Sequence, residues 1–314
     1  MRIYFLTILL LLVSVAVFLK IGYEHTSPKG PVKKNIVCTT SMVADAVEQI
    51  VGDTCTVQLL MGPGIDPHSY KASENDLYLL ENADIILFNG LHLEGKMGEI
   101  FATLASQSKA LAVTDCLSRE ELREVGFMGV YDPHVWFDVT LWSKVVTFIA
   151  QTCSTLLPEY EKLYYSNLET YVFKLKHLDE LCRQKMQAIP ENKRIIVTSH
   201  DAFGYFGAAY GCEVLGLQGL STDADISIKD ITDLVEYIIA HGITVIFAET
   251  VVPSRGLEAV QQACKARGWT VTIADKLYTD ALGLKNSSAG TYCGMIEHNL
   301  TVLEAALQGT VHVS

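Results

Sequence analysis

Two kinds of hydrophobic pattern alternate along the chain after the first 34 residues. Short runs rich in β-branched and apolar residues are bounded by polar or turn-forming residues, which is typical of strands. The predicted strands are Ile36–Thr39, Thr56–Leu60, Ile85–Phe88, Ala110–Val113, Arg194–Thr198, Glu213–Leu217, Val245–Ala248 and Thr270–Ile273. Apolar residues at intervals of three or four predict helices at Val43–Val51, Glu74–Ala83, Lys96–Ser106, Phe203–Tyr210, Ile228–His241, Gly256–Arg267 and Tyr292–Gln308. Because alternating strands and helices build parallel sheets covered on both faces, we expect an α/β fold with a four-stranded parallel sheet in each half.

The segment from Pro158 to Pro190 has no internal Gly or Pro. Its apolar residues form one stripe at helical spacing: Leu168, Tyr171, Leu175, Leu178, Cys182 and Met186. A helix of this length spans about 45 Å. We therefore predict two α/β lobes, 35–157 and 191–314, joined by one long rigid α-helix at 158–190. An ordinary long helix within one domain is the alternative.

The N-terminus has the pattern of a targeting segment. Met1-Arg2 precedes the apolar run Ile3–Leu19, which Lys20 closes. A basic start and a short apolar core are typical of a secretory signal, and the run is marginal in length for a spanning helix. We predict a signal peptide or a retained N-terminal anchor at 1–20 and a polar tether at 21–34, which places the folded part outside the cytoplasm.

Composition excludes several classes of protein. Of 314 residues, 49% are hydrophobic, and 36 acidic against 24 basic residues give a formal net charge of −12. A nucleic-acid-binding protein needs clustered Lys and Arg, so we expect no nucleic-acid partner. A disordered chain is excluded because this apolar content can bury enough surface to offset the entropy of ordering.

Four polar residues follow predicted strands. The tripeptide Asp-Pro-His occurs twice, at Asp66-Pro67-His68 and Asp132-Pro133-His134, and His200 and Asp280 follow strands of the second half. Each Pro constrains the backbone before its His, and each Asp can cap a helix or orient the imidazole. Any single His could be an ordinary loop residue. All four, however, follow strand ends where parallel sheets open their ligand crevices, and three imidazoles with one carboxylate suit a divalent transition metal.

Longer motifs around these residues resemble a known family. They are Gly62-Pro63-Gly64-Ile65-Asp66-Pro67-His68, Phe88-Asn89-Gly90-Leu91-His92-Leu93-Glu94, Asp132-Pro133-His134-Val135-Trp136-Phe137-Asp138, Ser199-His200-Asp201-Ala202-Phe203-Gly204-Tyr205-Phe206 and Tyr278-Thr279-Asp280-Ala281-Leu282-Gly283. The chain resembles the cluster A-I solute-binding proteins of zinc and manganese ABC importers, the ZnuA/TroA-like family. The resemblance implies two lobes joined by a rigid helix, with a metal site in the cleft between them.

The same resemblance implies the ligands, the partners and the location. The positions that hold the metal in the family match His68, His134, His200 and Asp280. The partners implied are the membrane permease subunits of an ABC transporter, with a cytoplasmic ATPase. The expected location is the periplasm or the extracytoplasmic face of the cytoplasmic membrane, and we expect a monomer.

Two features bear on which metal is carried. Dedicated manganese importers of the family usually have Glu at the position of His200. Dedicated zinc importers often have a His-rich acidic loop between the first two ligands, whereas the segment from Ser69 to Pro133 contains only His92. Three imidazoles favour Zn²⁺ by ligand softness, and availability allows Mn²⁺ or Fe²⁺ to bind. We expect zinc first and manganese close behind.

The remaining candidate residues receive ordinary interpretations. Glu249 is interpreted as a helix cap or a solvated loop residue in preference to a partner of the site, and His92 is not favoured as a ligand. The eight Cys show no C-x-x-C spacing, which argues against a thiolate metal site. Cys38 and Cys55 form a weak candidate for a disulfide, and buried free thiols are the alternative. We expect aromatic side chains to wall the site from water: Trp136, Phe137, Phe203, Tyr205 and Phe206.

Three classes of function remain open at this stage. The first is a non-enzymatic metal receptor, since four protein ligands close the coordination shell and catalytic zinc keeps one position for water. The second is an exported metallohydrolase that uses the same residues, although the chain has no H-E-x-x-H, G-x-S-x-G or phosphate-loop motif. The third is a metal-binding surface adhesin, which no residue pattern supports directly.

Overall fold

The structure is a computed structural model that describes residues 33–107, 109–126 and 129–309. The predicted signal segment 1–20 lies outside the described residues, as does the tether except Lys33 and Lys34. Within the described ranges, no helix has both the length and the apolar character needed to cross a bilayer.

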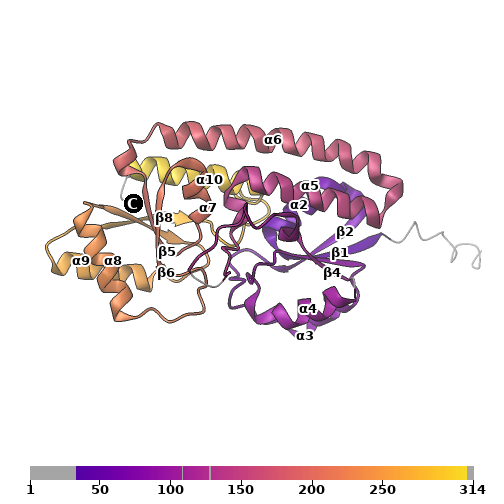
Figure 1. The fold of residues 1–314 in the computed structure, drawn as a ribbon, viewed down its shortest axis with the longest axis horizontal. Helices are drawn as coiled ribbons and strands as arrows, with labels where there is room; N and C mark the ends of the chain where they lie inside the picture. The colour runs from indigo at the N-terminus through magenta and orange to yellow at the C-terminus, as the bar shows by residue number, and fades with distance from the viewer. Residues whose placement is uncertain (1–32, 108, 127–128, 310–314) are drawn as a thin grey trace, which may run out of the picture. The chain divides into compact units, whose positions relative to one another are not determined.

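The first half contains the predicted four-stranded sheet. Its strands are β1 (Lys34–Thr40), β2 (Cys55–Met61), β3 (Ile85–Phe88) and β4 (Ala110–Ala112), in the order β2-β1-β3-β4. The β1–β3 and β3–β4 pairs are parallel. Its helices are α2 (Ser41–Val51), α3 (Glu74–Glu81), α4 (Gly98–Ser106) and α5 (Val139–Leu156). Helices α3 and α4 cover one face of this sheet, and α2 and α5 lie on the other (Figure 1).

The second half contains the four further strands that the sequence predicts. They are β5 (Ile195–His200), β6 (Glu213–Gln218), β7 (Val245–Glu249) and β8 (Thr272–Leu277). They form two parallel pairs, β5–β6 and β7–β8, and β5 packs beside β7. The second half thus has two two-stranded sheets in place of the expected single four-stranded sheet. At the carboxyl ends of β5 and β7, the His200 amide donates to the Glu249 side chain at 2.9 Å. The helices are α7 (Gly204–Tyr210), α8 (Ile228–Ala240), α9 (Arg255–Ala266) and α10 (Tyr292–Leu307).

Helix α5 has no counterpart among the predicted elements. Asp138 caps it by accepting from the amides of Thr140 and Leu141 at 2.8 and 3.2 Å. The segment is rich in β-branched residues, which lowers helix propensity. Burial outweighs that propensity, since Trp142 and Ile149 are fully buried.

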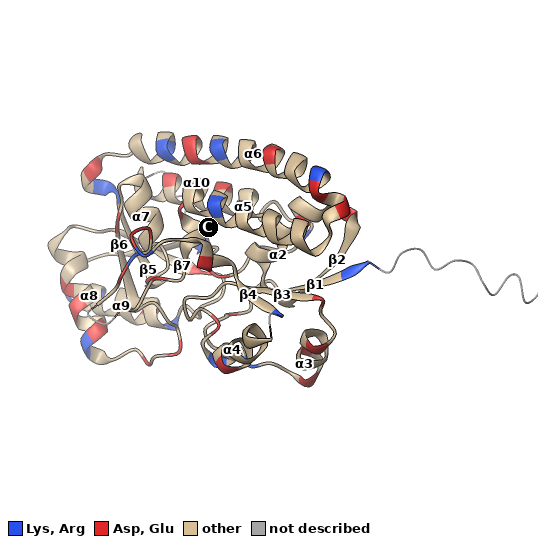
Figure 2. Cartoon of the chain, turned by 45° about the vertical axis from the view of Figure 1, so that its right-hand side comes forward, with Lys and Arg blue, Asp and Glu red and all other residues tan. Residues whose placement is uncertain are grey.

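The connecting helix α6 spans Glu161–Gln187, inside the predicted 158–190, and follows a short 3₁₀ helix at Pro158–Tyr160. Every residue of its predicted apolar stripe is buried. Basic and acidic residues alternate along the rest of its surface (Figure 2). At 27 residues, the helix is about 40 Å long, and it passes over both halves (Figure 1).

One hydrophobic core beneath α6 is shared by the two halves. Its fully buried members include Trp142 of the first half, Leu175 of α6 and Leu300 of the second half. Two smaller clusters are confined to one half each, under α3 and α4 and under α8 and α9. Residues from 35 onward form one compact unit, so the lobe boundaries 35–157, 158–190 and 191–314 stay a prediction.

All eight cysteines are free thiols in the structure. The candidate pair Cys38 and Cys55 is therefore not bonded, although both side chains are buried. Burial raises the pKa of the Cys38 thiol well above its ordinary value, and the neighbouring Cys153 adds to this shift. A protonated, buried thiol behaves as a small apolar side chain, which is its role in this core.

The shared core predicts unequal effects for two neighbouring residues of α6. Leu175 is 1% exposed and Phe173 is 64% exposed. Leu175→Ala should lower the free energy of unfolding by about 3 kcal/mol, because it removes buried methyl groups and leaves a cavity. Phe173→Ala should change it by no more than about 0.5 kcal/mol. Urea denaturation followed by circular dichroism measures both, and equal losses would contradict the assignment of the buried face.

Candidate metal centre

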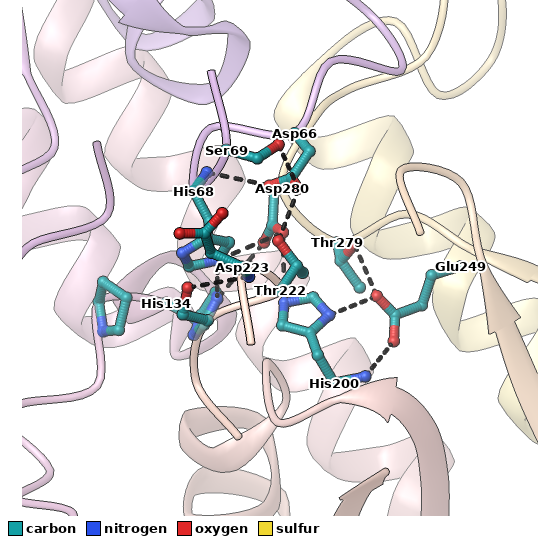
Figure 3. Close-up of polar contacts among 12 residues, drawn as sticks. Asp66, His68, Ser69, His134, His200, Thr222, Asp223, Glu249, Thr279 and Asp280 are labelled. Carbon is teal, nitrogen blue, oxygen red and sulfur yellow. Dashed lines mark hydrogen bonds and ion pairs between the residues drawn. The ribbon is translucent and has the colours of Figure 1, made fainter. Parts of the chain in front are cut away.

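The four predicted site residues lie together at the carboxyl ends of the strands. His68 is in the loop after β2, His134 directly precedes a 3₁₀ helix at Val135–Phe137, His200 ends β5, and Asp280 follows β8. One ligand atom from each lies within 4.8 Å of the others (Figure 3). Each half contributes two of these side chains. His92 is not among them, and its side chain is exposed.

The three imidazoles point their Nε2 atoms at the Asp280 carboxylate. The Nε2 atoms of His200, His134 and His68 lie 3.2, 3.5 and 3.7 Å from the Asp280 oxygens. His68 is 4% exposed, Asp280 is 2% exposed, and the other two are fully buried. His200 Nε2 and both Asp280 oxygens have no hydrogen-bond partner. Because unpaired buried polar atoms are costly, the four side chains form a group that could hold one metal ion.

The electrostatics of the cluster follow from its burial. Burial lowers the pKa of His68 to about 4, and the neighbouring His134 and His200 add to the effect of burial. Burial alone would raise the pKa of Asp280, but the surrounding imidazoles, His200 foremost, hold it below its ordinary range. Burial alone would lower the pKa of His200, but the carboxylates of Glu249 and Asp280 raise it well above its ordinary value. A neutral imidazole and an ionised carboxylate are the forms that bind a metal.

Glu249 is a partner of the site, and its interpretation as a capping or solvated residue is wrong. It is fully buried, and one oxygen lies 2.6 Å from His200 Nδ1 while the other accepts the His200 amide. Thr279 Oγ1 donates to it at 3.2 Å. Since a carboxylate only accepts, Nδ1 carries the hydrogen of that bond, and the lone pair of the neutral ring is on Nε2, facing the site. Its position in the sequence could have indicated this role, because Glu249 ends β7 and β7 lies beside β5, which His200 ends.

The two Asp-Pro-His tripeptides share a backbone turn and differ in the use of the carboxylate. In each, the Asp Oδ1 accepts the His amide at 2.9 Å. Asp132 Oδ1 also lies 2.7 Å from His134 Nδ1, so it orients that ring. Asp66 accepts from the hydroxyls of Ser69 and Thr222 with its other oxygen, at 2.9 and 2.6 Å. The predicted role of orienting the imidazole therefore applies to Asp132.

Trp136 separates the site from water, as predicted. It is fully buried, and its ring meets that of His134 edge to face at 5.3 Å. Its Nε1 donates to the Thr279 carbonyl at 3.1 Å, which joins the residues next to His134 and Asp280. The other predicted aromatic side chains, Phe137, Phe203, Tyr205 and Phe206, are also buried.

The turn at residues 89–94 supports the backbone next to His134. No structural role was assigned to this turn from the sequence. Asn89 Nδ2 donates to the Pro133 carbonyl at 3.1 Å, directly before His134. The buried Glu94 accepts the amides of Asn89 and Gly90 at 2.7 and 3.2 Å, which closes the turn. Leu91 within it adopts a positive φ of 52°. The motif from Phe88 to Glu94 thus holds the backbone that presents His134.

The sequence also matches a described protein family. Residues 36–306 match the family described as "Zinc-uptake complex component A periplasmic". The chain belongs to this family. The match confirms the predicted resemblance, and with it the two-half α/β fold around a long helix.

Individual relatives of the ZnuA family cover nearly the whole chain. The zinc-binding protein TroA of Treponema pallidum is 43% identical over 278 residues, covering 88% of this chain and 89% of that protein. The manganese-binding lipoprotein MntA of Bacillus subtilis is 41% identical over 287 residues, covering 91% and 94%. The solved structure of treponemal TroA superimposes with a TM-score of 0.86 at 42% identity, covering 88% of this chain and 99% of that one. The Fe(III)-bound YtgA of Chlamydia trachomatis does so with a TM-score of 0.80 at 27% identity, covering 88% and 98%.

The contact of Glu249 with His200 predicts a measurable effect on metal binding. Glu249→Gln leaves one accepting oxygen where the carboxylate has two, so the side chain cannot accept from both the His200 amide and Nδ1, and the ring is held less firmly with Nε2 facing the site. We expect zinc affinity to fall about 10–100-fold, the usual cost of losing the hydrogen-bond partner of a ligand. Calorimetric titration with Zn²⁺ measures this.

Asp45→Asn is the matched control for this substitution. Asp45 is also a buried carboxylate, bonded to Tyr171 and to the Tyr292 amide, and it touches none of the four site residues. This variant should bind zinc with unchanged affinity. Equal affinities of Glu249→Gln and the unaltered protein would contradict the orienting role of Glu249.

Proposed function

We propose that this protein is the extracytoplasmic solute-binding component of an ABC importer, which captures one divalent transition metal ion and delivers it to the membrane permease. His68, His134, His200 and Asp280 are the proposed ligands. The observation that carries the proposal is the convergence of four buried ligand atoms, two from each half, with both Asp280 oxygens and the Nε2 of His200 unpartnered. The metal is the cargo of the protein.

The donor set favours zinc, with manganese close behind and ferrous iron also accepted. Three imidazole nitrogens are borderline ligands that bind Zn²⁺ strongly, while the Asp280 carboxylate supplies the oxygen that Mn²⁺ and Fe²⁺ prefer. The names of the relatives are consistent with this range, since they include a zinc-binding, a manganese-binding and an iron-transporter protein.

The site supports binding and release in preference to catalysis. Four protein ligands complete a tetrahedral shell, whereas catalytic zinc keeps one position for water or substrate. The ligand side chains are nearly inaccessible, so a second reactant has no access beside the metal. We therefore propose a non-enzymatic protein that acts as a monomer and whose partners are the permease subunits, coupled to a cytoplasmic ATPase.

The proposed location is the periplasm or the outer side of the cytoplasmic membrane, reached through the signal at 1–20. Several relatives are named lipoproteins. The segment proposed to direct export is the apolar run Ile3–Leu19, whether it is cleaved or retained as an anchor.

Metal titration of ligand variants tests the proposed function. The unaltered protein should bind one equivalent of Zn²⁺ tightly, and Mn²⁺ less tightly. Loss of a residue that only hydrogen-bonds to a ligand lowers metal affinity by about 10–100-fold. His200→Ala removes a proposed ligand itself, so it should lower zinc affinity by more than that. His68→Ala and His134→Ala should also weaken binding while the metal-free variants stay folded.

His177→Ala provides the control for these variants. His177 lies on α6 with its side chain 63% exposed, so its loss should leave metal affinity unchanged. Failure of the unaltered protein to bind one equivalent of zinc or manganese would refute the receptor function. Turnover of an ester or phosphoester by the metal-loaded protein would favour a metallohydrolase instead.

A further inference from the structure

Of the four site side chains, that of His68 alone has any exposure to solvent in the described part of the chain. The side chain of His68 is 3% exposed, and those of His134, His200 and Asp280 are fully buried. Trp136, a member of the shared core, packs against the ring of His134. A metal ion therefore reaches or leaves this cluster past His68, and only if a covering segment moves.

A loop of the second half is bonded to the segment that carries His68. It is the loop Ser221–Asp225 between β6 and α8, whose Thr222 is bonded to Asp66, two residues before His68 (Figure 3). Thr222 Oγ1 donates to Asp66 Oδ2 at 2.6 Å, and Asp66 Oδ1 accepts the His68 amide at 2.9 Å. One carboxylate thus connects the loop to the backbone of a proposed ligand.

A second contact fastens the same loop to the first half. Lys96 Nζ lies 2.6 Å from Asp223 Oδ2, and these side chains are 36% and 49% exposed. An ion pair this exposed is screened by salt and contributes little. The hydrogen bond from Thr222 is partly buried and charge-assisted, so it is the stronger of the two.

This loop can move without disturbing the core. Ser221 and the residues 223–225 are exposed, whereas the link between the halves from Trp136 to Thr279 is buried. Gln218 Nε2 donates to the carbonyls of Thr222 and Ala224 at 3.3 and 2.6 Å. The loop is therefore held together as a unit, and its attachment to the first half consists of side-chain contacts at its tip.

We propose that Thr222 is a positioning residue that, through Asp66, latches the loop Ser221–Asp225 over the His68 side of the site and sets the rate of metal release. The Lys96–Asp223 pair is a weaker second fastening. This inference rests on the proposed function. It assigns Thr222 no role as a ligand, so its loss affects the rate at which the metal leaves more than the number of metal ions bound.

Release kinetics test the latch. Protein loaded with Zn²⁺ is mixed with excess chromogenic chelator, and the rate of zinc transfer is recorded. Thr222→Val, which keeps the shape and removes the hydroxyl, should release zinc about tenfold faster, as expected for a lost hydrogen bond to a charged group. Thr222→Ser retains the hydroxyl and should release at nearly the unaltered rate. Lys96→Met should release about twofold faster at low salt, and the difference should vanish at high salt.

Lys285→Met is the matched control. Lys285 pairs with Glu48 at 2.8 Å and is likewise exposed, but neither residue contacts the loop or Asp66. It should leave the release rate unchanged. The metal-free variants should melt within a few degrees of the unaltered protein, and all should bind one equivalent of zinc.

The outcomes separate this inference from the proposed function. Binding of one equivalent by every variant, with Thr222→Val releasing at the unaltered rate, would overturn the latch and leave the receptor function intact. The latch would also be overturned if Thr222→Ser released as fast as Thr222→Val, since the hydroxyl would then not be responsible. Failure of the unaltered protein to bind zinc or manganese would refute both.

Discussion

The apolar core shared beneath α6 is the constraint on which the metal site depends. Two proposed ligands come from each half, so their convergence requires the halves to keep one arrangement. Side chains of α2, α5, α6, α7 and α10 pack in the same core, and separating the halves as rigid bodies would expose it to water. The cost of exposing apolar surface, about 25 cal/mol per Å², makes a wide hinge opening unfavourable. The site is therefore held in shape by packing that lies outside it.

This constraint explains how the protein tolerates a buried polar cluster. Three imidazoles and a carboxylate with unpaired atoms cost free energy unless a cation satisfies them. The carboxylates next to the ligands hold two of the rings: Glu249 accepts three hydrogen bonds, and Asp132 Oδ1 accepts from the amide and ring of His134. Three unpaired buried atoms, His200 Nε2 and both Asp280 oxygens, lie at the point where the four side chains face one another. A site that is rigid outside and unsatisfied inside is suited to selecting a cation.

The sequence predicts the features that depend on neighbouring residues. It does not predict the features that depend on contacts between residues far apart in the chain. The strands, the stripe of α6 and the four proposed ligands follow from local pattern and from the rule that strand ends share one edge of a sheet. Helix α5 was missed because its β-branched residues favour strands until burial of Trp142 and Ile149 is known. Glu249 was misassigned because its role depends on β7 lying beside β5, which hydropathy does not reveal. Thr222 and Asp66 are 156 residues apart, and no local pattern connects them.

The repeated Asp-Pro-His tripeptide shows how one local motif acquires two roles from its surroundings. Both copies form the same turn, in which the aspartate holds the His amide. In the buried copy, Asp132 fixes the ring of His134 as well, so that ligand is held at both the backbone and the side chain. In the copy at the margin, Asp66 binds a loop of the other half, and no acceptor among the described residues holds Nδ1 of His68. Of the three imidazoles proposed as ligands, His68 therefore has the fewest contacts that hold its ring, which supports the proposed release of the metal past it.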